Sequence, residues 1–282
     1  MYEYWFMFFI AIIIATTAMT LGVGGALFFS PIFILLFPIL GVTVLSPADA
    51  FGAALITEVF GFASGLIGYG RKKLIDYKTA TSLLIFTVPL AIVGTIIKRQ
   101  INETGILNLI FGVGLLLLAL YIIKNISQKE PPIPSSNSPK RLLIDSDMNE
   151  YEYLVCNQNQ GRILSGIGGF VTGLISVGVG ETVVSTLRIR CGLPMRVATG
   201  TSVLVVTITV LSAALTDIAT IGVESVPYDL ILFTIPGVLI GGQIGAKVAS
   251  RVDSHTAERL LILIFVIFGG VMAVKALLDL FF

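Results

Sequence analysis

Long runs of apolar residues, separated by short polar turns, occupy most of this chain. By run length and by Gly and Pro punctuation they fall at roughly 4–21, 26–45, 49–69, 79–97, 105–123, 163–177, 182–192, 197–217, 228–248 and 258–281. Many approach the roughly 20 residues with which a helix crosses a bilayer, so the pattern predicts an all-α integral membrane protein. The polar stretch 125–162 carries a Pro/Ser run and predicts a linker with a small β-hairpin. It separates two membrane units, 1–124 and 163–282.

The two membrane units repeat each other. Residues 82–94 read SLLIFTVPLAIVG, and residues 229–241 read DLILFTIPGVLIG. Upstream, LGVGG at 21–25 corresponds to VGVGE at 177–181. A duplicated apolar half that is interrupted by Gly and Pro is typical of secondary transporters, in which the interruptions point to the substrate site.

The distribution of Lys and Arg predicts the topology. If each Gly-motif segment, such as 4–45, crosses the bilayer once, the two sides carry similar numbers of basic residues. If it forms a hairpin, one side collects fifteen and the other only Lys98, Arg99 and Lys275, as the positive-inside rule requires. A hairpin plus three spans is an odd number of crossings, so we expect two inverted repeats of about five segments, some of them half-length. The insert 125–162 is then cytoplasmic, and both termini lie outside the cell membrane.

Composition narrows the class of protein. Apolar residues make up 55% of the chain and charged residues 12%, with mean hydropathy +0.96, whereas a soluble domain is about 25% charged. The net charge of +1 gives no electrostatic case for nucleic acid. One histidine and two cysteines are too few for a metal cage or a disulfide framework, so neither metal nor cofactor is expected. The N-terminal MYEYWFMFFIAIII lacks the basic region of a signal peptide and predicts a retained first helix.

The two Gly motifs are the first candidate site. Glycine lets the chain leave helical geometry, and a broken helix frees N–H groups that can hold an anion. At membrane depth such backbone is tolerated only where it lines a cavity or is buried in protein. Small residues also serve close helix packing, which is the alternative. Because the motif occurs in equivalent places, we expect a central substrate site that includes Gly22, Gly24, Gly25, Gly178 and Gly180.

Two carboxyl groups and two prolines extend this interpretation. Glu58 lies near the middle of 49–69, and Glu181 directly follows the second Gly motif. Ionisable residues at such depth mark ion or proton pathways, and burial favours the neutral form of a carboxyl group. We therefore expect proton coupling, chiefly through Glu181; a neutral Glu that bonds across a helix interface is the alternative. Pro89 and Pro236 kink their helices and are either hinges for alternating access or static kinks.

Basic residues follow the second Gly motif. Arg188, Arg190 and Arg196 offer guanidinium forks that suit sulfonate, sulfite or carboxylate groups. Positive-inside charge already explains at least two of them, and we keep Arg190 as a candidate ligand. Cys191 lies between them, and a buried inert cysteine is favoured over a redox-active thiol.

With these residues in hand, the chain resembles the TauE/SafE sulfite-exporter family, permeases for small sulfur-containing anions. The resemblance rests on GVGGA and GVGET, on PADAFGAAL and PMRVATGTS, and on FTVPLAIVG and FTIPGVLIG. It implies a substrate site between the halves, carried over to Gly22–Gly25, Gly178–Glu181, Thr201 and Ser202. The chain departs from the commoner pattern at Glu181, where a third glycine often follows, and by its polar insert.

The sequence therefore predicts a proton-coupled secondary transporter, with alternating access, for sulfite, thiosulfate or organosulfonates. The alternatives are a passive anion channel and a transporter of another small organic anion. An enzyme is not expected, because the sequence has no GxSxG or HExxH motif and no paired intramembrane Asp. The expected partners are the anion and the lipid bilayer, without nucleic acid, and a homodimer is left open.

Overall fold

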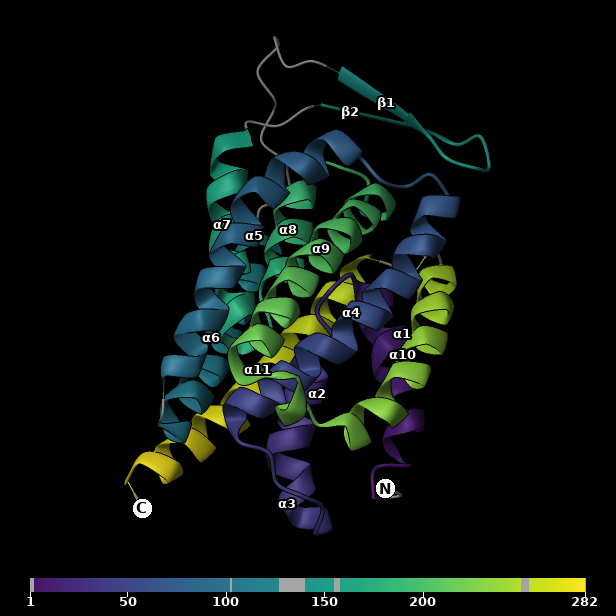
Figure 1. Ribbon diagram of the computed structural model, residues 1–282. Coiled ribbons are helices and arrows are strands. Elements are labelled where there is room, and N and C mark those ends of the chain that lie inside the picture. The colour runs from purple at the N-terminus through teal and green to yellow at the C-terminus, as the bar shows by residue number, and fades with distance from the viewer. Residues whose placement is uncertain (1–2, 102, 127–139, 155–157, 250–253, 282) are drawn as a thin grey trace.

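The computed structural model describes residues 3–101, 103–126, 140–154, 158–249 and 254–281, and helices dominate it (Figure 1). The first half contains α1 (Met7–Leu21), α2 (Ala26–Pro31), the π-helical segment η1 (Ile32–Leu36), α3 (Phe37–Leu40), α4 (Pro47–Arg71), α5 (Tyr77–Gln100) and α6 (Thr104–Ile126). The second half contains α7 (Gln158–Ile175), α8 (Val179–Ser185), the π-helical segment η2 (Thr186–Arg190), α9 (Met195–Ile221), the 3₁₀ turn η3 (Val223–Ser225), α10 (Tyr228–Val248) and α11 (Ser254–Phe281). The prediction of a mostly helical membrane protein is confirmed.

The helices differ in length in a regular way. Within the described residues, α4, α5, α6, α9, α10 and α11 are long and apolar enough to cross a membrane. The helices beside the Gly motifs are shorter. Helix α1 has 15 residues, which at 1.5 Å per residue is about 22 Å, less than the roughly 30 Å hydrocarbon core. Each Gly-motif segment is therefore a pair of short helices joined at a break.

Local signals set several helix ends. The Ser46 hydroxyl accepts a hydrogen bond from the Asp49 N–H at 3.2 Å, and Pro47 fills the first helical position of α4. At the other type of end, Gly22 closes α1 and Gly41 closes α3 in the left-handed conformation, with φ of 74° and 67°. Gly22 is thus the residue at which the first predicted break begins.

The two halves interlock. Helix α1 packs along α10, and α7, its counterpart, packs along α5, the counterpart of α10. Helices α4 and α9 meet each other at the centre, while α4 also packs on α10 and α9 on α5. Helices α6 and α11 pair with each other on one side of the bundle (Figure 1). Each half therefore buries its first helix against the other half.

Glycines permit the closest of these crossings. A Cβ atom on Gly241 of α10 would lie 2.5 Å from the Ile12 carbonyl oxygen of α1, and one on Gly169 of α7 would lie 2.5 Å from the Thr87 carbonyl oxygen of α5. Such distances exclude a side chain, so small residues bring the backbones together here. Close helix packing through small residues, which was the alternative role for the Gly motifs, therefore occurs at these two crossings.

The mid-helix prolines lie in continuous helices. Pro89 is inside α5 and Pro236 is inside α10. Two residues before each, a buried threonine bonds across to a neighbouring helix: the Thr87 and Thr209 hydroxyls are 2.8 Å apart. On the other side, the Thr234 hydroxyl is 2.9 Å from that of a threonine on α4. The hinge role of both prolines stays a prediction.

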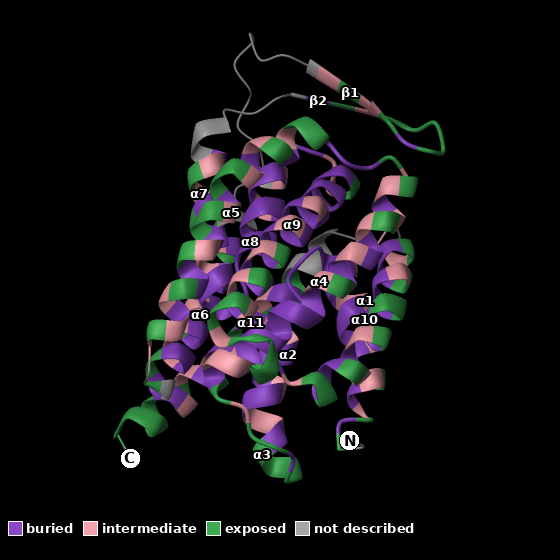
Figure 2. Cartoon of the chain, in the orientation of Figure 1, coloured by how far each residue is buried: buried purple, intermediate pink, exposed green. Residues whose placement is uncertain are grey.

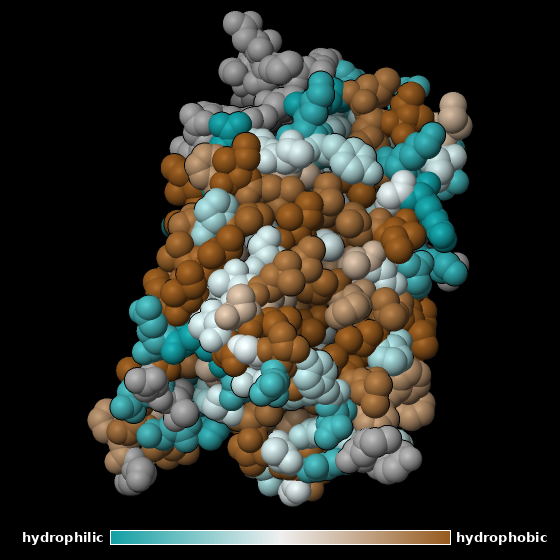
Figure 3. All heavy atoms as spheres, viewed as in Figure 1, coloured by the Kyte–Doolittle hydropathy of each residue, from teal (hydrophilic) through white to brown (hydrophobic). Residues whose placement is uncertain are grey.

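Apolar side chains cover the outside of the bundle as well as its interior. Figure 2 shows buried positions along its centre and exposed positions on the outward faces of the long helices. Large apolar side chains such as Ile85, Leu117 and Val274 are well exposed. In Figure 3 apolar residues cover much of the side of the bundle, and most hydrophilic ones gather toward its ends. Such a surface fits lipid contact.

The insert contains a two-stranded antiparallel sheet of β1 (Lys140–Ile144) and β2 (Glu150–Leu154), in which Leu142 pairs with Glu152. It sits at one end of the bundle, opposite to the start of α1 and the end of α11 (Figure 1). The segment 127–139, which holds the Pro/Ser run, lies outside the described residues.

One carboxylate fastens the hairpin to the bundle. Arg141 donates to Asp76 Oδ2 at 2.7 Å, and the Tyr153 hydroxyl donates to the same oxygen at 3.0 Å. Asp76 also caps α5 by accepting from the Thr79 N–H at 3.2 Å. Burial works to raise the pKa of Asp76, but the bonds from Thr79 and Tyr153 and the charge of Arg141 outweigh it and hold that pKa below its usual value. We call Asp76, Arg141 and Tyr153 the hairpin latch.

Candidate functional site

The two Gly motifs, which belong to different halves, lie against each other. A Cβ atom on Gly180 would lie 3.3 Å from the Gly22 carbonyl oxygen and 3.3 Å from the Gly24 nitrogen. Gly22 and Gly178 supply backbone conformation, with φ of 74° and 136°. Gly24 and Gly180 supply space instead. The structure thus brings together the two breaks that the sequence singled out.

The second break begins slightly earlier than the Gly motif. Ser176 has φ of 66°, and its hydroxyl donates to the Phe51 carbonyl oxygen of α4 at 2.7 Å. The Val179 N–H donates to the Thr172 hydroxyl at 2.7 Å, so one backbone donor that the break frees is bound by a side chain of α7. These side-chain bonds satisfy backbone that has left the helical ladder, as burial in protein requires.

Glu181 bridges the two breaks. Its Oε2 accepts from the Gly178 N–H at 3.0 Å, which caps its own short helix, and its Oε1 accepts from the Gly24 N–H at 3.1 Å. The residue is 3% exposed. Both carboxyl oxygens therefore have donors, one from each half of the chain.

Glu58 reaches the same place from α4. Its Oε1 accepts from the Ala26 N–H, at the start of α2, at 2.9 Å. Its Oε2 is buried and has no hydrogen-bond partner among the described residues. A Cβ atom on Gly24 would lie 2.8 Å from the Glu58 Oε1 and 3.7 Å from the Glu181 Oε1. The two carboxyl groups therefore flank Gly24.

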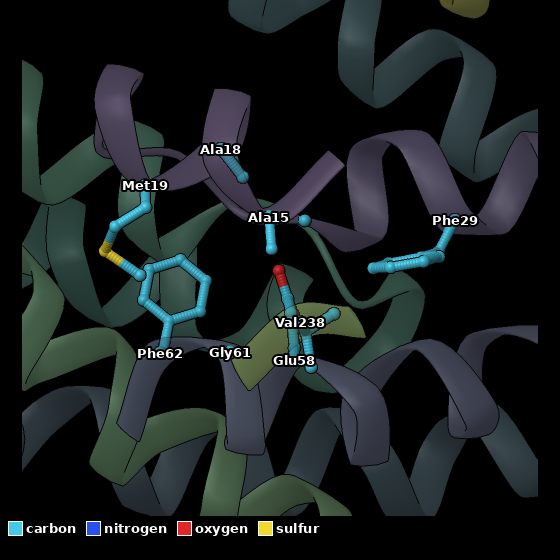
Figure 4. Close-up of a pocket in the computed structure, with 9 residues that line it drawn as sticks. Ala15, Ala18, Met19, Phe29, Glu58, Gly61, Phe62 and Val238 are labelled. Atoms are coloured by element: carbon cyan, nitrogen blue, oxygen red, sulfur yellow. The ribbon is translucent and has the colours of Figure 1, made fainter. Parts of the chain in front are cut away.

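A small cavity adjoins Glu58 between α1, α2, α4 and α10 (Figure 4). Figure 4 shows the Glu58 side chain reaching into it with an oxygen toward Ala15. Ala15, Phe29, Phe62 and Val238 are among the apolar residues that line it, and Gly25 of the first motif takes part. Its volume of about 10 Å³ is about the minimum for one water molecule. The bundle is closed around Glu58 in this conformation, without room there for a polyatomic anion.

The remaining candidates from the sequence lie in different places. Ser202 lies at the second motif, where its hydroxyl donates to the Gly180 carbonyl oxygen at 3.3 Å. Thr201 is buried, and its hydroxyl accepts from the Asp76 N–H at 2.9 Å, toward the hairpin latch. Arg190 belongs to η2, and its side chain lies outside the described residues. Cys191 is buried, as expected, but is disulfide-bonded, which the cysteine count did not predict.

The structure also contains a buried ionic cluster that was not predicted from the sequence. Asp217 of α9 lies 2.7 Å from the Lys98 Nζ, and it accepts from Arg99 Nε at 2.8 Å and Nη2 at 2.7 Å. Arg99 also donates to Asp49 Oδ1 of α4 at 2.6 Å. The Lys98 and Asp217 side chains are 0% exposed, and Gly52 leaves the space for Asp217. We call Lys98, Arg99, Asp217 and Asp49 the ionic cluster.

A signal for this cluster was present. Asp217 is an ionisable residue in an apolar segment, the same property that selected Glu58. Lys98 and Arg99 were counted as loop charge on one side of the membrane because they come at the end of their segment. Asp49, at the start of its segment, forms an ion pair with Arg99.

The site is chemically a set of backbone donors around carboxyl oxygens. The N–H groups of Gly24, Ala26 and Gly178 all point to carboxyl oxygens of Glu58 or Glu181. Donors of this kind, released where a helix is broken, suit carboxylate, sulfite or sulfonate oxygens equally.

Comparison with known proteins gives a consistent picture. The family model described as "Sulfite exporter TauE/SafE" matches residues 7–273. The "Probable membrane transporter protein YunE" of Bacillus subtilis (strain 168) is 22% identical over 261 residues, which cover 92% of this chain and 93% of that protein. The "Probable membrane transporter protein YjnA" of the same organism is 28% identical over 247 residues, covering 82% and 85%. No solved structure is a significant match.

Proposed function

The chain belongs to the sulfite exporter TauE/SafE family and is a membrane transporter. We propose that it moves small sulfur-containing anions across the plasma membrane, either in exchange for protons or together with them. Sulfite, thiosulfate and organosulfonates are the proposed substrates. The family description names sulfite, and the donor groups at the helix breaks fit oxyanions.

One observation carries this proposal: the two helix breaks meet, and their N–H groups hold buried carboxyl oxygens. At membrane depth an anion needs hydrogen-bond donors that are already buried in the protein and free of the helical ladder, and the N–H groups of Gly24, Ala26 and Gly178 are such donors. In this closed conformation the carboxyl groups of Glu58 and Glu181 occupy them. We propose that the oxygens of a substrate anion take one of these places when a carboxyl group leaves it.

We further propose that the halves are inverted repeats that alternate about the site. The exchange of partners between α1–α10 and α7–α5 supports this, because a two-fold relation between the halves produces such paired contacts. Ten membrane segments, an insert on the cytoplasmic side and both termini outside follow from the charge distribution. Single cysteines at Lys72 and Lys275 should then be labelled from opposite sides of sealed vesicles. Labelling of both from one side would refute this topology.

Transport in proteoliposomes tests the function. We expect sulfite, thiosulfate or sulfoacetate to accumulate above the outside concentration when a pH gradient is imposed, with taurine and sulfate as comparison solutes. Equilibration without accumulation would identify a passive channel. Protein-free liposomes control for permeation of the neutral acid forms. Absence of any flux for all five solutes would refute the proposed substrate class.

A further inference from the structure

The two buried carboxyl groups of the site differ in how completely they are bound. Glu181 has a backbone donor on each oxygen, from Gly24 and Gly178. Glu58 has a donor on Oε1 alone, from Ala26, and its Oε2 is without a partner among the described residues. Both residues are only 3% exposed, so solvent on the surface does not make up the difference.

This difference decides which group can take up a proton. A proton on either oxygen of Glu181 weakens that oxygen as the acceptor of an N–H bond that it already receives, and so costs part of the bridge between the breaks. A proton on Oε2 of Glu58 leaves Oε1, the acceptor for the Ala26 N–H, unprotonated. It also removes the charge from a buried oxygen that has no hydrogen-bond donor among the described residues, an arrangement that is costly for a carboxylate.

The surroundings of Glu58 strengthen the case. From α1 it faces Ala15 and Met19, from α2 Phe29 and from α10 Val238, all of them uncharged and apolar. From α8 the titratable group that faces it is Glu181, whose charge acts on it across Gly24. Among the described residues, no cation lines the cavity that could hold Glu58 in its charged form.

We propose that Glu58 is the proton-binding residue of the transport cycle, that the cavity beside it is where the proton arrives, and that Glu181 is a fixed anchor between the two breaks. This rests on the proposed function and reverses the emphasis of the sequence analysis, which expected Glu181 to carry the coupling. The proton comes from water on the open side and binds Glu58 Oε2. The neutral side chain holds the Ala26 N–H less strongly, which frees that donor for an anion, and both leave on the other side.

The first test detects the proton itself and needs no transport. Difference infrared spectra of the purified protein between acidic and alkaline buffer should show the carbonyl band of a buried carboxylic acid. We expect Glu58→Gln to remove this band, while Glu181→Gln and the exposed control Glu224→Gln keep it. Glu58→Asp, which keeps an acid with a shorter stem, should shift the pH midpoint of the band and serves if Glu58→Gln does not fold. A band that is lost in Glu181→Gln and unchanged in both Glu58 variants would overturn the assignment.

The second test separates coupling from binding. In proteoliposomes we expect Glu58→Gln to exchange labelled anion across the membrane but to lose accumulation driven by a pH gradient, so that the inside-to-outside ratio falls to about one. Wild-type accumulation in Glu58→Gln would overturn the proposal. If the wild-type protein moves none of the solutes, the proposed function fails, and the infrared band still decides whether Glu58 binds the proton.

Discussion

Replacement of Asp217 by Asn should be among the most damaging conservative changes in this protein. Asp217 is the anion that Lys98 and Arg99 share, and neither Asp217 nor Lys98 has any exposed side-chain surface. The amide keeps the shape of the carboxylate and removes its charge. Lys98 is then a buried ammonium group without a counter-ion, and Arg99 keeps only Asp49.

The expected cost follows from this geometry. Removal of one partner from a buried ion pair costs roughly 3–5 kcal/mol, because the other charge stays buried and unpaired. The same Asp→Asn change at Asp279, which forms a partly exposed pair with Lys275 four residues before it at 3.2 Å, should cost less than about 1 kcal/mol. Asp279→Asn is therefore the matched control.

Unfolding in mixed micelles of a nonionic and an anionic detergent measures the difference. We expect the free energy of unfolding to fall several times more for Asp217→Asn than for Asp279→Asn. The double variant Lys98→Met, Asp217→Leu should recover most of the loss, because it removes both charges and keeps similar volume. Equal effects of Asp217→Asn and Asp279→Asn would show that the ionic cluster is not buried as described.

Three further outcomes are expected. Gly180→Val should reduce transport by more than about tenfold, since a β-branched side chain at Gly180 fills the space between the two breaks. The control Gly270→Val, at a position with open space for a Cβ, should have little effect. Equal transport by both variants would contradict the site. Arg141→Ala should release the hairpin at a cost of about 1–2 kcal/mol, seen as faster hydrogen exchange in 140–154 without loss at α9. The hairpin latch should be complete above the ordinary Asp pKa of about 3.9 and be lost only as pH falls through the lowered pKa of Asp76; loss of exchange protection already near pH 6 would contradict it.

The helices and the meeting of the breaks could be predicted because the sequence states them directly. Apolar runs with Gly and Pro between them define where each helix begins and ends, and the structure places helices over all the predicted segments. The duplication indicated that the two Gly motifs are equivalent, and the structure brings the two breaks together. Glu181 was found for the same reason, since it is next to the motif in the chain.

The partners of Glu58 and of the ionic cluster could not be predicted, because they depend on how each helix is rotated about its own axis. Ala26 is 32 residues from Glu58, and Asp217 is 118 from Arg99. In a soluble protein the polar face of a helix shows which side points to solvent and so fixes the rotation of the helix about its axis. A helix that is apolar on nearly every face carries no such information in its sequence. Only packing, here through Gly52 beside Asp217, determines which side chains face each other.

The two ends of α5 are held by different sets of side chains, and the internal repeat of the sequence does not account for this difference. Asp76 caps the first end and binds the hairpin, while Lys98 and Arg99 anchor the far end about 33 Å away at 1.5 Å per residue. In the other half, the positions that correspond to Lys98 and Asp217 are Gly245 and Gly70, which have no charge. Under the alternating mechanism that we propose, the protein must release one end at a time. The two fastenings therefore open at different cost: the Lys98–Asp217 pair has no exposed side-chain surface, whereas Arg141 of the Asp76 pair is 26% exposed. The ionic cluster is the harder to open, because its ions lose their partners before water reaches them.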